Sequence, residues 1–230
     1  MALIGERRAV AAAVLIMYAF FYAVIAMLAA PPGWENAYFG MSAVYGVAFF
    51  GVVAGYFWAR WYALGVAISG AITAGVGIWQ VGPEPIVLFL AGTHLAAVLA
   101  LTGNAMRVPF EGQAQWRKKM HLDDNAVARL GKSVTRAAIS VPYFVLYLLS
   151  PSGQANGLVA FAAVATGAGL VGLVRTRTWS LVALVASSAA MCGGIALGAG
   201  LLAVPGAVLA AAAVWPWRSP LAAAVFSKRG

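Results

Sequence analysis

The chain has 230 residues, of which 63% are hydrophobic and only 9% are charged, and its mean hydropathy is +0.88. A soluble domain needs about a quarter of its residues charged to cover its surface, so this composition excludes a water-soluble globular protein. The apolar stretches do not alternate as in an outer-membrane barrel, and the single cysteine, Cys192, excludes an internal disulfide. The sequence therefore predicts an all-α, polytopic bundle of membrane helices.

Eight apolar stretches approach the length of about 20 residues that a helix needs to cross a membrane. In chain order they are 9–30, 39–58, 61–80, 86–106, 133–150, 157–174, 179–197 and 201–217. Helix breakers lie between them, among them Pro31-Pro32-Gly33 and Gly82-Pro83. The first stretch is longer than the apolar part of a cleavable signal peptide, so we expect it to be retained. Pro142 predicts an interruption of the fifth stretch, the shortest.

The basic residues indicate the orientation of these helices. With eight crossings and a cytoplasmic N-terminus, all 15 Lys and Arg residues lie on the cytoplasmic side, and Glu35 and Glu84 lie on the other. Positive charge stays on the cytoplasmic side of membrane proteins. We therefore expect a multi-pass protein of the cell membrane, of the bacterial inner-membrane kind, with both termini in the cytoplasm.

The two halves of the chain share short patterns at a nearly constant offset. Pro31-Pro-Gly33 matches Pro151-Ser-Gly153, and Trp61 matches Trp179. The offsets predict two parallel sets of four helices, a 4+4 tandem repeat; convergent loop composition would give the same matches. The predicted units are a first membrane half at 1–106, a basic cytoplasmic loop at 107–132, and a second membrane half at 133–230.

The loop at 107–132 is predicted to contain a short amphipathic helix that Asp123 or Asp124 caps. Its cations favour contact with anionic lipid headgroups or with a cytoplasmic protein partner. Nucleic acid is not an expected partner, because the basic excess already follows from the topology. The candidate lipid or partner contacts are Arg117, Lys118, Lys119, Arg129 and Lys132.

The fourth stretch carries the main candidate polar site. Ionisable groups within a membrane are costly, and His94, beside Thr93, lies near the middle of this stretch. The imidazole fits a proton relay, a cofactor contact or a substrate hydrogen bond; it fits equally a structural hydrogen bond between helices. Gln80 and Glu84 lie at the external mouth, where Glu84 attracts a cation or caps the helix.

Two further features suggest other local roles. Ser140, beside Pro142, belongs to the candidate polar site if that helix is broken, because broken helices expose backbone carbonyls. Gly51-x-x-x-Gly55 and Gly194-x-x-x-Gly198 permit close helix packing, within the chain or between copies.

No pattern in the sequence indicates a metal site, a cofactor or a known catalytic motif. The scarcity of polar residues favours a non-enzymatic accessory or scaffold subunit of a larger membrane assembly, with a protein partner or a second copy of itself. The alternative is a small transporter or channel whose pathway runs between the two halves near Glu84 and His94. A third hypothesis is a lipid-modifying enzyme that uses Asp123, His121 and Arg117.

Overall fold

The computed structural model describes residues 3–120, 123–149, 157–196, 208 and 211–218, and in these residues it contains helices and no strands. The long helices are α1 (Leu3–Leu28), α2 (Glu35–Ala54), α3 (Ala59–Val81), α4 (Pro85–Leu101), α7 (Asp124–Leu149), α8 (Gly157–Val174) and α9 (Trp179–Ala196). Shorter pieces are η1 (Asn104–Met106), α5 (Val108–Glu111), α6 (Ala114–Met120) and η2 (Trp215–Trp217).

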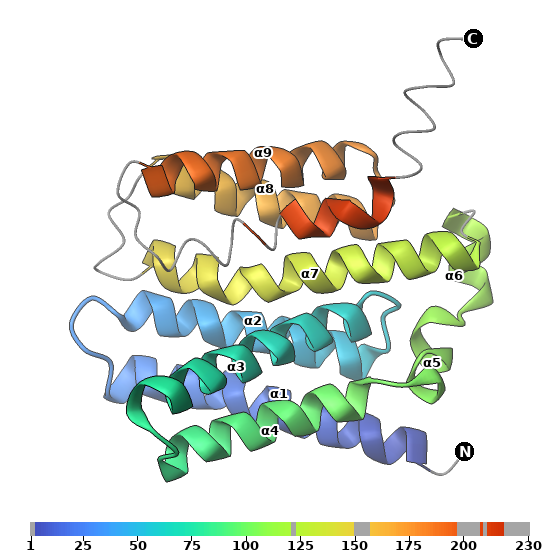
Figure 1. Ribbon diagram of the computed structural model, residues 1–230. Helices are drawn as coiled ribbons and strands as arrows, with labels where there is room; N and C mark the ends of the chain where they lie inside the picture. The colour runs from blue at the N-terminus through green and yellow to red at the C-terminus, as the bar shows by residue number, and fades with distance from the viewer. Residues whose placement is uncertain (1–2, 121–122, 150–156, 197–207, 209–210, 219–230) are drawn as a thin grey trace.

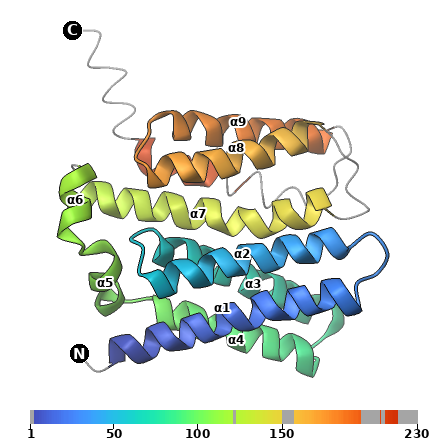
Figure 2. The same ribbon diagram turned by 180° about the vertical axis from the view of Figure 1, so that it is seen from behind.

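The long helices run side by side, and α7 lies between two groups of helices (Figure 1). On one side, α1 packs on α2 and α4, and α3 packs on α2 and α4. On the other side, α8 packs on α7 and α9, and η2 also contacts α7. The view from behind shows α1 and α2 crossing in front of α3 and α4, with α7 above them (Figure 2). Helix α7 is therefore the element that joins the first four helices to the rest.

Glycine and proline end and start the helices of the first group. Helix α2 ends at Gly55, whose φ of +73° allows its N–H to bond to the carbonyls of Gly51 and Val52. Gly82, with φ +89°, ends α3, and Pro85 begins α4, where its missing N–H costs nothing. The predicted ends of these helices differ from the observed ones by one to six residues. The largest differences are the start of α1 and the end of α4, which stops at Leu101 before Gly103, with φ +93°.

Among the described residues, three helices are long and apolar enough to cross a membrane: α1, α2 and α3. A fourth crossing is obtained if α4 and the segment Asn104–Glu111, bent by 72° relative to each other, form one broken span. Helices α8 and α9 contain shorter apolar stretches, Ala160–Val174 and Trp179–Gly193. The chain is thus an all-helical protein with several helices suited to a membrane.

Helix α7 differs from the sequence prediction. It runs without a break from the basic segment through Pro142, so Pro142 does not interrupt it and the helix is 26 residues long. In the turn before the proline, the Ser140 hydroxyl donates to the carbonyl of Ala137 at 2.6 Å. The amphipathic segment predicted within 107–132 is the first part of α7, which crosses the expected unit boundary at 132/133. Asp123 caps this helix, accepting from the backbone N–H of Ala126 at 2.6 Å.

Two glycines allow α3 and α7 to approach closely. A Cβ atom on Gly65 of α3 would lie 2.6 Å from both the Ala138 Cβ and the Thr135 carbonyl oxygen of α7. On α7, a Cβ atom on Gly131 would lie 2.6 Å from the indole nitrogen of Trp61. Small residues at a crossing let helix backbones meet, so these positions fix α7 against α3.

The eighth predicted helix, at 201–217, falls mostly outside the described residues, as does the Pro151–Gly153 match of the repeat. The described part of that region, 211–218, packs on α7. Ala213 is fully buried, and the Trp217 indole N–H donates to the Ser133 hydroxyl at 2.9 Å.

Candidate functional site

The His94 ring is enclosed among the first four helices, and only 2% of the residue is exposed. Its Nδ1 lies 2.8 Å from the carbonyl oxygen of Leu90, one turn earlier on α4, so this nitrogen donates. In the neutral ring Nε2 then accepts from the Tyr45 hydroxyl of α2, at 2.7 Å. Both ring nitrogens are thus satisfied by the bundle itself.

A second pair lies beside this one. The Tyr18 hydroxyl of α1 is 2.5 Å from the Thr93 hydroxyl, and its ring centroid is 4.2 Å from that of His94. From α3, Gly70 leaves room for the imidazole, because a Cβ atom there would lie 2.0 Å from His94 ring atoms. We call Tyr18, Tyr45, Thr93 and His94 the tyrosine–histidine cluster. It connects α1, α2 and α4 across the centre of the first group.

The residues expected at the external mouth are separate from this cluster. Glu84 precedes α4 at its N-cap position but makes no side-chain cap hydrogen bond, and both Glu84 and Gln80 are exposed. Glu84 is ten residues from His94, which corresponds to about 15 Å along a helix. His94 lies among the helices of the first group, whereas Glu84 lies at the start of α4.

Of the other residues singled out from the sequence, Ser140, Gly51 and Gly55 make contacts within their own helix or with the adjoining turn. Ser140 is fully buried on α7 and bonds within its own helix. Gly51 packs against Ala59 and Trp58 at the turn into α3, whereas Gly55 is the left-handed cap of α2. Gly194 lies in α9, and Gly198 lies outside the described residues.

At the opposite end of the first group, arginines cap the C-terminal ends of helices. Arg8 donates to the carbonyls of Val52 and Val53 at the end of α2, at 2.9 and 2.6 Å. Arg7 donates to the carbonyls of Leu99, at 2.6 Å, and of Thr102, at the end of α4. These carbonyls lie at the ends of their helices, where the regular helix bonds run out and the negative end of the dipole lies, so guanidinium groups stabilise them. The Val52 carbonyl also accepts from the Gly55 N–H, and the Leu99 carbonyl from the Thr102 hydroxyl. We call this end of the bundle the basic end.

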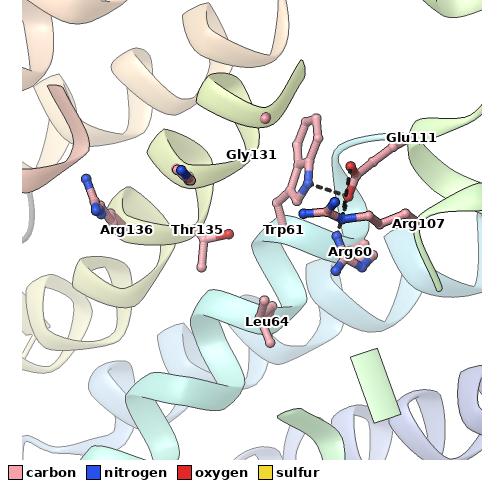
Figure 3. A pocket seen from close by; sticks show the side chains of 10 residues that line it. Arg60, Trp61, Leu64, Arg107, Glu111, Gly131, Thr135 and Arg136 are labelled. Atoms are coloured by element: carbon pink, nitrogen blue, oxygen red, sulfur yellow. Dashed lines mark hydrogen bonds and ion pairs between the residues drawn. The ribbon is translucent and has the colours of Figure 1, made fainter. Parts of the chain in front are cut away.

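Arg60, at the start of α3, is the most enclosed cation of the basic end, with 6% of the residue exposed. Its Nε donates to the carbonyl of Leu101 at 2.8 Å, and it forms an ion pair with Glu111. The Glu111 carboxylate also accepts from the Trp61 indole at 2.8 Å and lies 3.9 Å from Arg107 (Figure 3). One carboxylate thus organises an arginine and a tryptophan of α3 and an arginine that precedes α5.

Beside this carboxylate lies a pocket of about 270 Å³ between α3 and α7. We call it the basic pocket. The α4–α5 connection forms one side of it. Helix α7 forms another side with residues at helical spacing, 128, 131, 132, 135 and 136. It is lined by Arg60, Trp61, Leu64, Arg107, Glu111, Ala128, Gly131, Lys132, Thr135 and Arg136. The lining includes four cations and one carboxylate, so it carries three excess positive charges, and one of the cations, Arg136, also donates to the carbonyl of Ala212 at 2.8 Å.

The basic residues singled out from the sequence as lipid or partner contacts differ in exposure and in partners. Arg117 of α6 pairs with the exposed Asp124, Lys118 is exposed, and Arg129 is half-buried on α7. Lys132 is exposed and belongs to the basic pocket. Lys119 lies in α6, next to Lys118. Of the residues proposed for a lipid enzyme, Asp123 caps α7, Arg117 pairs with Asp124, and His121 lies outside the described residues.

Sequence reasoning missed Tyr18, Tyr45, Arg60 and Glu111 as site residues. One signal was present: Glu111 is the only carboxylate between Glu84 and Asp123, within an otherwise basic segment. Trp61, noted in the sequence as a match to Trp179 in the repeat, is buried at 3% exposure. In the part of the chain that the structure describes, no group of three His, Cys, Asp or Glu side chains is placed to hold a metal ion.

Comparisons with protein-family models, curated proteins and solved structures find no match for this chain.

Proposed function

We propose that the chain is an integral membrane protein with eight crossings in two sets of four. Its basic end faces the cytoplasm, in a membrane of the bacterial inner-membrane kind. It acts there as a non-enzymatic accessory or scaffold subunit of a larger membrane assembly. The orientation is supported by the gathering of Arg7, Arg8, Arg60 and Arg107 at one end of the helices, since cytoplasmic ends carry the positive charge.

The observation that carries the proposed role is the pairing of polar groups inside the bundle. His94 bonds to Tyr45 and Thr93 to Tyr18. The second group shows the same behaviour: the Thr166 and Ser187 hydroxyls lie 2.5 Å apart, and Ser187 also donates to the carbonyl of Ala162 at 2.7 Å. A pathway for ions or polar solutes needs such groups to face the solute. Here they hold helices together, as in a structural subunit.

Purification in a mild detergent at native expression tests this role. We expect one or more protein partners, or a second copy of the chain, to copurify in a fixed ratio. A monodisperse, partner-free monomer would contradict the proposal. Solute flux in proteoliposomes that the His94→Ala variant abolishes while still folding would instead support a transporter.

The orientation has its own test, which uses single cysteines in a Cys192→Ser background. Gln115→Cys lies in the exposed part of α6 at the basic end, and Glu84→Cys lies at the opposite end. In intact cells a membrane-impermeant thiol reagent should label Glu84→Cys and spare Gln115→Cys. The reverse pattern would overturn the proposed orientation.

A further inference from the structure

We infer that the basic pocket is a binding site for a phosphate group, carried either by a membrane lipid or by a soluble phosphate compound. This inference goes beyond the scaffold role and does not depend on any partner protein. It also differs from a general attraction of surface cations to anionic lipid, because it assigns the ligand to one pocket between α3, α7 and the α4–α5 connection.

The first argument is the charge of the lining. Glu111 is committed to Arg60 and Trp61, and Arg107 approaches its carboxylate only to 3.9 Å. Within the described residues, neither Lys132 nor Arg136 forms an ion pair with a carboxylate. Cations gathered around a single carboxylate repel one another, and a bound anion removes that repulsion. The pocket is therefore short of negative charge.

The second argument is the kind of donor available. Guanidinium groups match phosphate oxygens with two parallel N–H bonds, and a lysine adds a mobile point charge. Arg107 provides such a fork with half of its side chain exposed, and Lys132 lines the same pocket from α7. The Thr135 hydroxyl points from α7 toward the Trp61 side of the pocket and adds a neutral donor (Figure 3). This set suits a phosphate better than a single carboxylate.

The third argument is the shape of the pocket. The α3 part of its lining is held in place, because Arg60 bonds to the Leu101 carbonyl and to Glu111, and Trp61 bonds to Glu111. Directly after Leu64, α3 and α7 touch at Gly65 and Ala138, which closes the pocket toward the middle of the bundle. A volume of about 270 Å³ that ends there fits a compact headgroup rather than a long acyl chain.

The test compares two double variants that remove the same charge from the same end of the molecule. Arg107→Ala/Lys132→Ala removes two cations of the pocket that are not buried in the fold. Arg175→Ala/Arg177→Ala removes two exposed cations from the turn between α8 and α9, outside the pocket. Both variants are reconstituted in phosphatidylcholine nanodiscs, and their melting temperatures are recorded to confirm folding.

Two probes separate the possible sources of the phosphate. Glycerol 3-phosphate is titrated into the nanodiscs by calorimetry, and phosphatidylglycerol retained from a mixed phosphatidylcholine–phosphatidylglycerol membrane is counted by native mass spectrometry. Saturable binding of glycerol 3-phosphate to the wild type would identify a soluble phosphate compound as the ligand, and retention of phosphatidylglycerol would identify a lipid. We expect Arg107→Ala/Lys132→Ala to weaken that binding about tenfold or more, because hydrogen bonds to charged groups are the strong ones. Arg107→Lys/Lys132→Arg should recover most of it.

Three results would overturn the assignment. One is the absence of saturable binding of both probes to the wild type. Another is equal weakening by the two alanine variants, which would mean attraction by overall charge. The third is undiminished binding to Arg107→Ala/Lys132→Ala. The scaffold role stands or falls separately, because it depends on copurifying partners.

Discussion

The tyrosine–histidine cluster and the basic end use polar groups in opposite ways. In the cluster, one pair of hydroxyl groups and one hydroxyl–imidazole pair form hydrogen bonds inside the first group of helices. At the basic end, some arginines cap helix carbonyls, while Lys132 and Arg107 retain donors that face a pocket. The comparison shows that a polar residue within a membrane protein indicates a binding site only when the fold leaves it donors or charge to spare.

Removal of Glu111 should have the largest effect on stability. Glu111→Ala leaves the buried Arg60 without its counter-charge, and such a loss costs about 3 kcal/mol of the free energy of unfolding. Unfolding by sodium dodecyl sulfate titration in mixed micelles measures it. The control is Asp124→Ala, which breaks an exposed ion pair with Arg117 and should cost below about 1 kcal/mol. Equal losses would show that Glu111 does not organise the basic end.

Gly70→Ala should be nearly as damaging, because the new Cβ atom would lie 2.0 Å from the His94 ring. Overpacking of this kind costs about 3 kcal/mol, measured by the same titration. Gly75 lies on the same helix and has no atom within 4 Å of its added Cβ, so Gly75→Ala should be neutral or slightly stabilising. A tolerated Gly70→Ala would mean that the cluster is looser than the structure describes.

Tyr45→Phe should have a moderate effect, because it leaves the buried Nε2 of His94 without a partner. The expected loss is about 1 kcal/mol, the usual size for a hydrogen bond between membrane helices. Tyr38→Phe is the matched control, since Tyr38 stacks on Tyr22 through its ring, which phenylalanine retains. If Tyr45→Phe is as stable as Tyr38→Phe, the hydrogen bond between Tyr45 and His94 does not contribute to the stability of the bundle.

Arg8→Ala should produce the smallest measurable change. It removes two bonds to carbonyls at the end of α2, one of them exposed, and interactions of this kind contribute about 0.5–1 kcal/mol. The loss should shrink at high salt, which screens exposed charges. Arg177→Ala, in the turn between α8 and α9, is expected to leave the melting temperature unchanged. An equal effect of both would argue against capping by Arg8.

The first three helices and the start of α4 could be predicted from the sequence, because continuous apolar runs end there at Gly and Pro. The continuity of α7 could not. Its first part is basic and amphipathic and its second part apolar, so composition suggested a boundary near residue 132, and Pro142 suggested a break. In the structure α7 has neither the boundary nor the break. Val127, Leu130 and Val134, on both sides of residue 132, pack in one cluster with Trp61.

The candidate site was predictable only in part. His94 and Thr93 stood out as polar residues in an apolar stretch, but their partners did not. Tyr45 precedes His94 by 49 residues and Tyr18 precedes Thr93 by 75, so these pairs depend on which helices touch. Burial of Arg60 was hidden for the same reason, since its Glu111 partner lies 51 residues later.

The capping arginines of α1 have a consequence for the order in which the protein matures during synthesis. Arg8 meets the end of α2 only after 45 more residues have been made, and Arg7 reaches Thr102 after 95. Arg8 can therefore fasten α1 to α2 before α3 has been made. The Arg7 contact needs the end of α4, so its formation marks the completion of the four-helix unit.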